Sequence, residues 1–260
     1  MSEPIKIVIC VLTMHERTGW VCNPLAQWLT DLPLTMGDKY QISTTYAHNF
    51  MPAASARNRF CRRMKTAEPR PDWLLMIDND MVPPRNLLDT VKGAPKDASV
   101  VVPQFQMWDE SKPSVALCWG MDDVVAPKDR DGGQSFTIES NRWYELTKCG
   151  TGAIFIKPDV FEKLELPYFS YPYNEEHGIN GTEDIDFCQK IRAKGMKIYG
   201  NGSVRVGHYK TVNLDVLMRY VHLVKEQTEK EVLESLRKSG KLVADEAECP
   251  SDSPAMACPA

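Results

Sequence analysis

Several features that would assign the chain to a special class are missing from its 260 residues. No apolar run approaches the roughly 18 residues that cross a bilayer, and the amino-terminal residues lack the apolar core of a secretory signal peptide. The eight cysteines include no Cys-x-x-Cys pair, which excludes the common zinc and thiol redox motifs. We therefore expect a soluble cytoplasmic protein that does not span a membrane and keeps its cysteines reduced.

The chain also lacks an internal repeat and a large excess of either charge. Lys and Arg number 31 and Asp and Glu 35, which gives a net charge of −4 and no overall field toward nucleic acid or an anionic membrane. Hydrophobic residues make up 43% and charged residues 25%, so a disordered polyelectrolyte is excluded. The length suits one large domain with a buried core.

The sequence does contain an alternation of strand-like and helix-like segments. Continuous apolar runs predict buried strands, and segments with helical periodicity lie between them. The expected strands are 5–12, 40–46, 73–77, 99–102, 115–119, 136–146, 153–156 and 203–206, and the expected helices are 25–32, 52–65, 84–91, 158–164, 182–194 and 214–236. This order predicts an α/β fold, a mixed and mainly parallel sheet with helices on both faces. Ligands of such sheets bind at the carboxyl ends of the strands.

The sharpest motif stands at one of these strand ends. Asp78-Asn79-Asp80 directly follows an apolar run, and carboxylates two residues apart can hold one divalent cation. A polar turn after a strand accounts equally well for these residues taken alone. The acidic ligands and the glycine of an EF-hand are missing at the required offsets.

A second motif opens the helix predicted at 182–194. Thr182 can cap this helix, which puts Glu183 and Asp184 in its first turn, where the helix N-terminus favours the ionised carboxylate. Such a carboxylate suits a general base that takes a proton from a hydroxyl group. Simple complementation of the helix dipole is the alternative, and for Asp186 we expect only a solvated first-turn charge.

A third motif, Gly207-His208, ends the last predicted strand. An imidazole there can bind a metal, and mixed carboxylate and imidazole ligation favours Mn²⁺, with Mg²⁺ as the other candidate. Taken alone, His208 is explained equally well as a hydrogen-bonded structural histidine. Lys210, close by, is placed to meet a phosphate or to remain exposed.

Together the three motifs resemble the GT-A fold glycosyltransferases that use nucleotide-sugar donors, in the broad family-2-like group that includes phage enzymes. The resemblance runs from residue 5 to about residue 210. Its motifs are Asp78-Asn79-Asp80, Ala56-Arg57-Asn58, Gly150-Thr151-Gly152, the run Glu183 to Cys188, and Gly207-His208. Their order and spacing carry the resemblance, since each motif alone is weak.

The resemblance implies a role for each matching residue. Asp78, Asp80 and His208 resemble the metal ligands, and Asp184, or else Glu183, resembles the catalytic base. The donor-binding residues implied are Thr13, Arg57, Asp78, Asn79 and Lys210, and the acceptor-binding residues are Trp119, Thr151 and Gly152. The first strand runs into Thr13-Met14-His15-Glu16 instead of the common Pro-x-Tyr-Asn, which leaves the nucleotide preference open.

We therefore expect a metal-dependent transfer of a sugar from a nucleotide diphosphate, a UDP-sugar first, to an acceptor hydroxyl, with inversion and Asp184 as the base. Retention, a nucleotidyltransferase and a non-catalytic binding module are the alternatives. A nucleotidyltransferase normally has a Gly-rich phosphate loop after the first strand, which residues 13–19 lack. The acceptor is open, and a DNA base is one option for it.

Three segments are expected along the chain. Residues 1–211 form the catalytic domain, and 212–239 form an amphipathic helix that packs on this domain or on a second copy in a dimer. Residues 240–260, rich in Pro, Ser, Ala and acidic residues, form a disordered tail. The basic stretch from Arg57 to Arg70 is expected to be mostly a solvated helix face, with Arg57 as its one ligand contact.

Overall fold

The computed structural model describes residues 3–13, 21–35, 37–48, 53–109, 114–119, 123–125, 142–176, 178–179, 181–209 and 214–238. Two compact units divide the chain, residues 1–210 and 211–260. The strands of the first unit are β1 (Ile5–Thr13), β2 (Tyr40–His48), β3 (Trp73–Asp78), β4 (Met81–Val82), β5 (Ala98–Asp109), β6 (Ser114–Leu117), β7 (Trp143–Leu146), β8 (Ala153–Ile156), β9 (Tyr173–Asn174), β10 (Gly178–Ile179) and β11 (Lys197–His208). Its α-helices are α1 (Asn23–Thr35), α2 (Ala53–Lys65), α3 (Val160–Lys163) and α4 (Glu183–Ala193), and η1 (Gly37–Lys39) and η2 (Leu87–Val91) are short 3₁₀ helices.

One large sheet organises the first unit. Its strand order in the described part of the chain is β2-β1-β3-β8-β5-β11-β4, with β6 added beside β5 and β7 beside β11. Parallel pairing joins β1 to β2, β1 to β3 and β5 to β11, while β8 runs antiparallel to both β3 and β5. The five strands β2, β1, β3, β5 and β11 therefore point the same way, and their carboxyl ends meet at one edge. The predicted mixed, mainly parallel sheet is confirmed.

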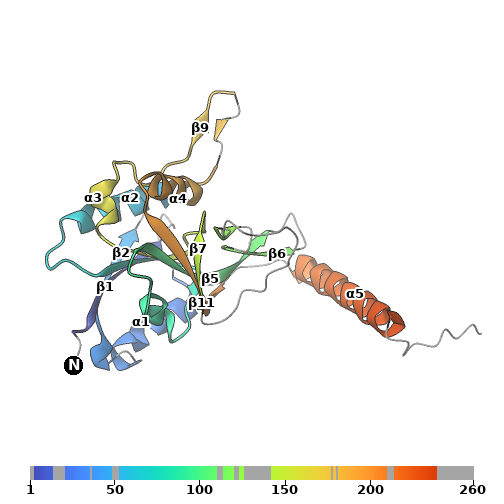
Figure 1. Cartoon of the computed structure of the whole chain (residues 1–260). Coiled ribbons are helices and arrows are strands. Elements are labelled where there is room, and N and C mark those ends of the chain that lie inside the picture. Colours follow the sequence, from blue (N-terminus) through green and yellow to red (C-terminus); the bar gives the residue numbers. More distant parts are fainter. Residues whose placement is uncertain are drawn as a thin grey trace, which may run out of the picture. The chain divides into compact units, whose positions relative to one another are not determined.

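Helices cover both faces of this sheet (Figure 1). The connection through α1 moves the chain to one side of β1 and the connection through α2 moves it to the other, so right-handed crossovers put these helices on opposite faces. Leu25, Trp28 and Leu32 form the buried stripe of α1. The buried stripe of α2 includes Ala56, Arg57 and Phe60, so a charged residue lies on the apolar face of this helix.

The core lies on the central strands. Every residue of β8 and the first five residues of β3 are buried, as expected for strands that are covered on both faces. The six cysteines of the described residues are free and buried, among them Cys149 and Cys188, whose sulfur atoms lie 3.7 Å apart. Burial accounts for their place in apolar runs, because a free cysteine packs as a small hydrophobe.

Several elements differ from the sequence predictions. The helix expected at 84–91 is only the 3₁₀ turn η2, and β11 begins at Lys197, six residues earlier than predicted. The hairpin of β9 and β10 lies in the stretch between the expected helices 158–164 and 182–194, where no strand was expected. Of the strand expected at 136–146, the structure describes β7 at its end, and residues 126–141 lie outside the described residues.

The second unit contains α5 (Leu214–Lys238), a helix of 25 residues at the position predicted for the carboxyl-terminal helix. Most of its described side chains are exposed. No helix among the described residues combines the length and the hydropathy that crossing a membrane requires. The expected tail at 240–260 lies outside the described residues.

Candidate functional site

The carboxyl ends of three strands bring the predicted motifs together. Asp78 ends β3 level with Leu12 of β1, and the N–H of Asp78 donates to the carbonyl of Gly152 just before β8. The N–H of Asn79 donates to the Leu12 carbonyl, which fixes the turn after β3 against the end of β1. Asp78-Asn79-Asp80 is therefore held at the sheet edge where ligands of this fold class bind.

Arg57 of α2 is the centre of the first half of the site. Its guanidinium donates to Asp78 Oδ1 at 3.0 Å and to the Thr151 carbonyl at 3.2 Å, and its Nε lies 3.6 Å from Glu183 Oε1. The guanidinium carbon also lies 5.9 Å from the centre of the Phe169 ring. The Arg57 side chain is only 3% exposed. One buried cation thus joins α2, β3, the segment before β8 and the start of α4.

The carboxylates around Arg57 repel one another. Burial raises the pKa of Asp78 above its ordinary value, and Asp80 and Glu183 add to this rise, while Arg57 opposes it. Burial also raises the pKa of Tyr171, with Glu183 as the next cause. Asp78, Asp80 and Glu183 therefore lie close enough to act on each other electrostatically, with the Arg57 guanidinium between Asp78 and Glu183.

The second half of the site depends on the two-residue strand β4. Met81 and Val82 pair antiparallel with His208 and Gly207, and the N–H of Tyr209 donates to the Asp80 carbonyl at 2.6 Å. A Cβ atom at Gly207 would lie 3.0 Å from Val82 Cβ, so this close crossing favours glycine before the histidine. The pairing puts Asp80 Oδ2 3.1 Å from His208 Nε2.

The other ring nitrogen determines what this contact means. His208 Nδ1 lies 2.9 Å from the Gln106 carbonyl oxygen, which can only accept, so Nδ1 carries a hydrogen. In the neutral ring Nε2 then has a lone pair that faces a carboxylate oxygen. Either a proton between the two atoms or a cation that both atoms bind would satisfy the contact.

The donor set fits a divalent cation in part. Two neighbouring ligands on one cation with bonds of ~2.1 Å are about 3 Å apart, close to the separation of the Asp80 and His208 atoms. The Gln106 carbonyl orients the ring in the way that outer-shell acceptors orient histidine ligands. Asp78, the third predicted ligand, instead pairs with Arg57. Within the described residues no group of three or more His, Cys, Asp and Glu side chains is arranged to hold a metal ion.

The start of α4 carries the two candidate bases in different settings. Glu183 pairs with Arg57, whereas Asp184 Oδ1 accepts from the Thr182 hydroxyl and, at 2.9 Å, from the Ile185 N–H. No hydrogen bond from the described residues reaches Asp184 Oδ2. Thr182 is the N-cap residue, but its side chain makes no capping bond to the helix backbone, so the expected cap is replaced by the bond to Asp184.

Two residues near the site have roles that the sequence did not reveal. Asn58 brackets the backbone of Phe169: its amide donates to the Phe169 carbonyl at 2.7 Å, and its oxygen accepts from the Phe169 N–H at 3.0 Å. The expectation of a solvated Asp186 is wrong. Its carboxylate accepts from the N–H and hydroxyl of Ser170 and from Lys190, and its side chain is 14% exposed. Asn58 thus ties the segment 167–172 to α2, and Asp186 ties it to α4.

The remaining predicted donor and acceptor residues are mostly at the same edge. Thr13 is buried, and its hydroxyl donates to the Ala47 carbonyl at 3.2 Å. Asn79 accepts from the Cys22 N–H through its backbone carbonyl. Thr151 and Gly152 contribute the two carbonyl groups that receive Arg57 and Asp78. Lys210 lies outside the described residues.

Trp119 has a different environment from the one expected of an acceptor-binding residue. Its side chain has no exposed surface, its indole N–H donates to the Pro103 carbonyl, and its ring lies 5.7 Å from that of Tyr144. A Cβ atom at Gly200 would lie 2.6 Å from the indole. In this structure Trp119 is a core residue, so we leave it out of the proposed acceptor site.

Comparisons with known proteins agree with the fold. No family model matches the chain, and no curated protein does so. Among solved structures, A197 from STIV is 18% identical, with a TM-score of 0.50 over 80% of this chain and 87% of that one. This likeness shows the fold alone.

Two further structures are more distant. GalNAc-T7 with UDP, GalNAc and Mn²⁺ is 14% identical, with a TM-score of 0.46 over 80% of this chain and 44% of that one. A mutant Drosophila β1,4-galactosyltransferase 7 with manganese, UDP-Gal and xylobiose is 14% identical, with a TM-score of 0.41 over 80% of this chain and 72% of that one. At these identities and TM-scores the two likenesses assign no family.

Proposed function

We propose that the protein is a metal-dependent glycosyltransferase of the family-2-like group, which transfers a sugar from a nucleotide diphosphate donor to an acceptor hydroxyl. The observation that carries the proposal is the contact of Asp80 Oδ2 with His208 Nε2, because the bond of Nδ1 to the Gln106 carbonyl leaves two atoms that can each donate a lone pair to one cation. A divalent cation, Mn²⁺ or Mg²⁺, satisfies both. Asp78 and Glu183, two carboxylates that share the single cation Arg57, add negative charge that favours binding of the divalent cation.

The chemistry follows from the groups at this edge. Asp80 and His208 would hold the cation, which neutralises the charge of the departing diphosphate. Asp78 orients this end of β3 through Arg57, and Thr13, Asn79 and Lys210 are the further candidates for donor contacts. Thr151 and Gly152 line the same edge and are candidates for the acceptor side.

Asp184 is the proposed base. Its Oδ1 is held by Thr182 and Ile185, and its Oδ2 is the atom that we assign to proton acceptance. The acceptor hydroxyl gives its proton to Oδ2 as its oxygen bonds to the anomeric carbon, and the bond from that carbon to the diphosphate breaks with the electron pair on the leaving group. This single displacement inverts the anomeric carbon. Glu183 is less suited, since its carboxylate faces Arg57.

The test is a metal-dependent ligand screen followed by a comparison of variants. Unfolding midpoints are measured with Mn²⁺ and each of UDP, GDP, CDP and dTDP, with and without chelator, and release of the nucleoside diphosphate from the matching sugar donor is then assayed. We expect one nucleotide, UDP first, to raise the midpoint only with metal. Failure of every nucleotide, or a shift independent of metal, contradicts the proposal.

Variants separate the two roles. Asp184→Asn should retain the donor-dependent shift and lose release of nucleoside diphosphate, whereas Asp80→Ala should lose both. Asp97→Asn is the matched control, because Asp97 is an exposed carboxylate at the start of β5, at the opposite edge of the sheet. Equal loss of binding in the Asp80 and Asp184 variants contradicts these roles. Release of pyrophosphate would identify a nucleotidyltransferase, and donor binding without turnover would identify a binding module.

A further inference from the structure

The strand β2 is an edge strand whose own residues include no Lys, Arg, Asp, Glu or Pro that would protect it. It stands at the end of the sheet order, and in the described part of the chain it pairs only with β1. Edge strands of this length are commonly protected by a charged side chain or a proline. The nine residues of β2, YQISTTYAH, contain no Lys, Arg, Asp, Glu or Pro. Their outward backbone groups can therefore pair with another strand.

The pairing of β2 with β1 sorts its side chains into two sets. Ser43 is level with Val8 and Thr45 with Cys10, and Cys10 lines a hollow together with Phe60 of α2, so this set faces the α2 side. Alternation along a strand puts the other set on the opposite side. That set is Ile42, Thr44 and Tyr46, all uncharged.

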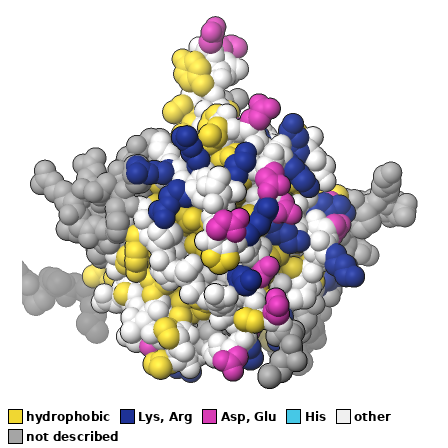
Figure 2. Space-filling view, turned by 90° about the vertical axis from the view of Figure 1, so that its left-hand side faces the viewer, with side chains coloured by type: hydrophobic (Ala, Val, Ile, Leu, Met, Phe, Trp, Pro, Cys, Tyr) yellow, Lys and Arg dark blue, Asp and Glu magenta, His cyan; other side chains and the backbone are white. Residues whose placement is uncertain are grey.

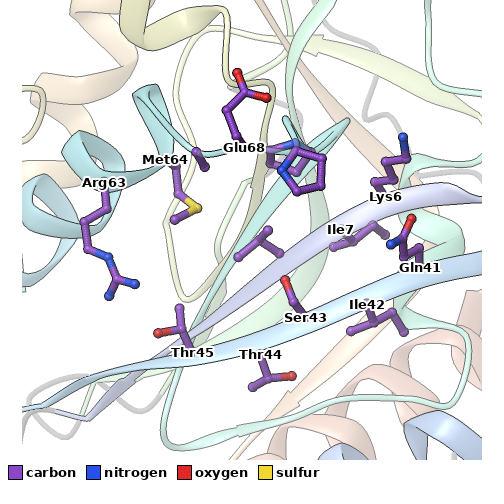
Figure 3. Close-up of a pocket in the computed structure, with 14 residues that line it drawn as sticks. Lys6, Ile7, Gln41, Ile42, Ser43, Thr44, Thr45, Arg63, Met64 and Glu68 are labelled. Carbon is purple, nitrogen blue, oxygen red and sulfur yellow. The ribbon is translucent and has the colours of Figure 1, made fainter.

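A groove of about 470 Å³ follows β2 on the α2 side (Figure 3). Ser43 and Thr45 belong to its floor, Arg63 of α2 stands at one end and Lys6 of β1 at the other. A smaller hollow of about 30 Å³ shares Thr45 and Arg63 with this groove and continues it to Arg59. The groove therefore runs along the strand edge and has a basic side chain at each end.

The lining of the groove contains more basic than acidic side chains, Lys6 and Arg63 against Glu68. Neither Arg63 nor Lys6 makes an ion pair with the described residues. The one acidic residue of the lining, Glu68, directs its carboxylate away from the floor (Figure 3). On the side of the molecule in Figure 2, Lys and Arg side chains gather in the upper left part of the described surface, while elsewhere they are interspersed with acidic ones.

We propose that β2 binds an extended acidic peptide segment of a partner protein as an additional strand. Backbone pairing with an open edge requires a strand, and every second side chain of that strand would point into the basic groove. The intervening side chains would lie beside Ile42, Thr44 and Tyr46. The structure therefore favours alternating acidic and apolar residues. This inference is independent of the proposed glycosyltransferase activity.

A second copy of this chain is a poorer occupant of the edge. Antiparallel pairing of two β2 strands about Ser43 would bring Arg63 of each copy toward Lys6 of the other, because Arg63 lies near Thr45 and Lys6 is level with Gln41. Like charges would then face each other across the interface. An acidic peptide meets the same residues with complementary charge.

The test uses a fluorescein-labelled peptide of alternating glutamate and valine, about nine residues long to match β2, with the full-length protein. Anisotropy is measured for the wild type, for Arg63→Glu and for the matched control Arg62→Glu. Arg62 is the exposed neighbour on α2 and lines neither hollow. We expect Arg63→Glu to weaken binding by about tenfold or more and Arg62→Glu by less than about twofold. Unchanged unfolding midpoints verify that both variants fold.

Amide hydrogen exchange separates strand pairing from simple charge attraction. The bound peptide should slow exchange in the segment 41–46, and a peptide of the same composition with its glutamates in one block should bind more weakly. Equal binding of the two peptides, equal effects of the two variants, or no protection of this segment overturns the proposal. Preference for a single-stranded oligonucleotide, or a dimer in sedimentation that excludes the peptide, also overturns it.

Discussion

The two aspartates of Asp78-Asn79-Asp80 lie only two residues apart, yet their carboxylates have opposite kinds of partner. Asp78 faces a buried arginine that also reaches Glu183 and the Thr151 carbonyl. Asp80 faces His208 Nε2, while the other ring nitrogen, Nδ1, donates to the Gln106 carbonyl. The first carboxylate is neutralised within the protein, and the second calls for a proton or a metal ion. We call Asp78 with Arg57 the structural half of the site, and Asp80 with His208 the half that we propose to bind the metal.

The largest expected effect comes from Arg57→Met, which removes the cation from the structural half. Two carboxylates, 20% and 13% exposed, would lose their common partner, so we expect the free energy of unfolding to fall by about 3–5 kcal/mol. Denaturant unfolding measures this. Arg62→Met, on the exposed face of the same helix, should change it by less than ~0.5 kcal/mol. Similar losses in the two variants would mean that Arg57 is not the centre of the cluster.

Metal removal should act on the other half alone. Mn²⁺ at about 100 times its dissociation constant should stabilise the wild type by ~2.7 kcal/mol, and chelator should abolish this. Asp80→Asn should show no metal effect. Without metal it should be at least as stable as the wild type, since the new amide can donate to His208 Nε2. A full metal effect in this variant would place the cation elsewhere.

Asn58→Ala tests whether the hydrogen bonds of Asn58 to Phe169, in the segment 167–172, contribute to stability. The change leaves the N–H and carbonyl of Phe169 without their partner, for an expected loss of about 2 kcal/mol in unfolding free energy. The exposed Asn86, whose side chain makes no capping bond, supplies the control Asn86→Ala with little change expected. An unchanged free energy of unfolding in Asn58→Ala would show that these two hydrogen bonds do not hold the segment 167–172 in place.

The smallest effect is expected for Asp186→Asn. Its carboxylate binds Ser170 and Lys190 at a partly exposed position, so the charge should contribute about 1 kcal/mol, measured as a shift in the denaturant midpoint. An unchanged midpoint would mean that Asp186 contributes no more than the solvated first-turn charge that the sequence alone indicates. We expect this variant to bind metal as the wild type does, which would show that the contacts of Asp186 do not affect the proposed metal pair.

The sequence predicted the sheet and the location of the site because both depend on local patterns. Apolar runs mark β1 and β3, and polar residues after them mark the edge where ligands bind. The sequence named Asp80 and His208 as candidate ligands but could not predict their contact. That contact depends on β4, a strand of two residues that is too short to show a sequence pattern. The antiparallel direction of β8 likewise depends on tertiary pairing with β3 and β5.

Side-chain roles were predicted less well than side-chain positions. The apolar spacing of α2 includes Arg57, and this is a signal for a buried charge with dedicated partners. The local sequence does not distinguish Asp186 from Asp184, because both are carboxylates in the first turn of α4. In the structure Asp186 binds Ser170, whereas Asp184 Oδ2 accepts no hydrogen bond from the described residues. Trp119 was assigned to acceptor binding, but its packing against Gly200, far away in the sequence, could not be predicted.

The pairing of β4 with the end of β11 makes the proposed metal pair a late product of folding. Asp80 and His208 are separated by 128 residues, and the separation closes only when the last strand of the sheet has joined it. During synthesis on the ribosome, Asp80 could contact His208 only after nearly the whole first unit has been made. Metal affinity would then report that the domain has been completed, and a truncated product ending before β11 would have no competent site.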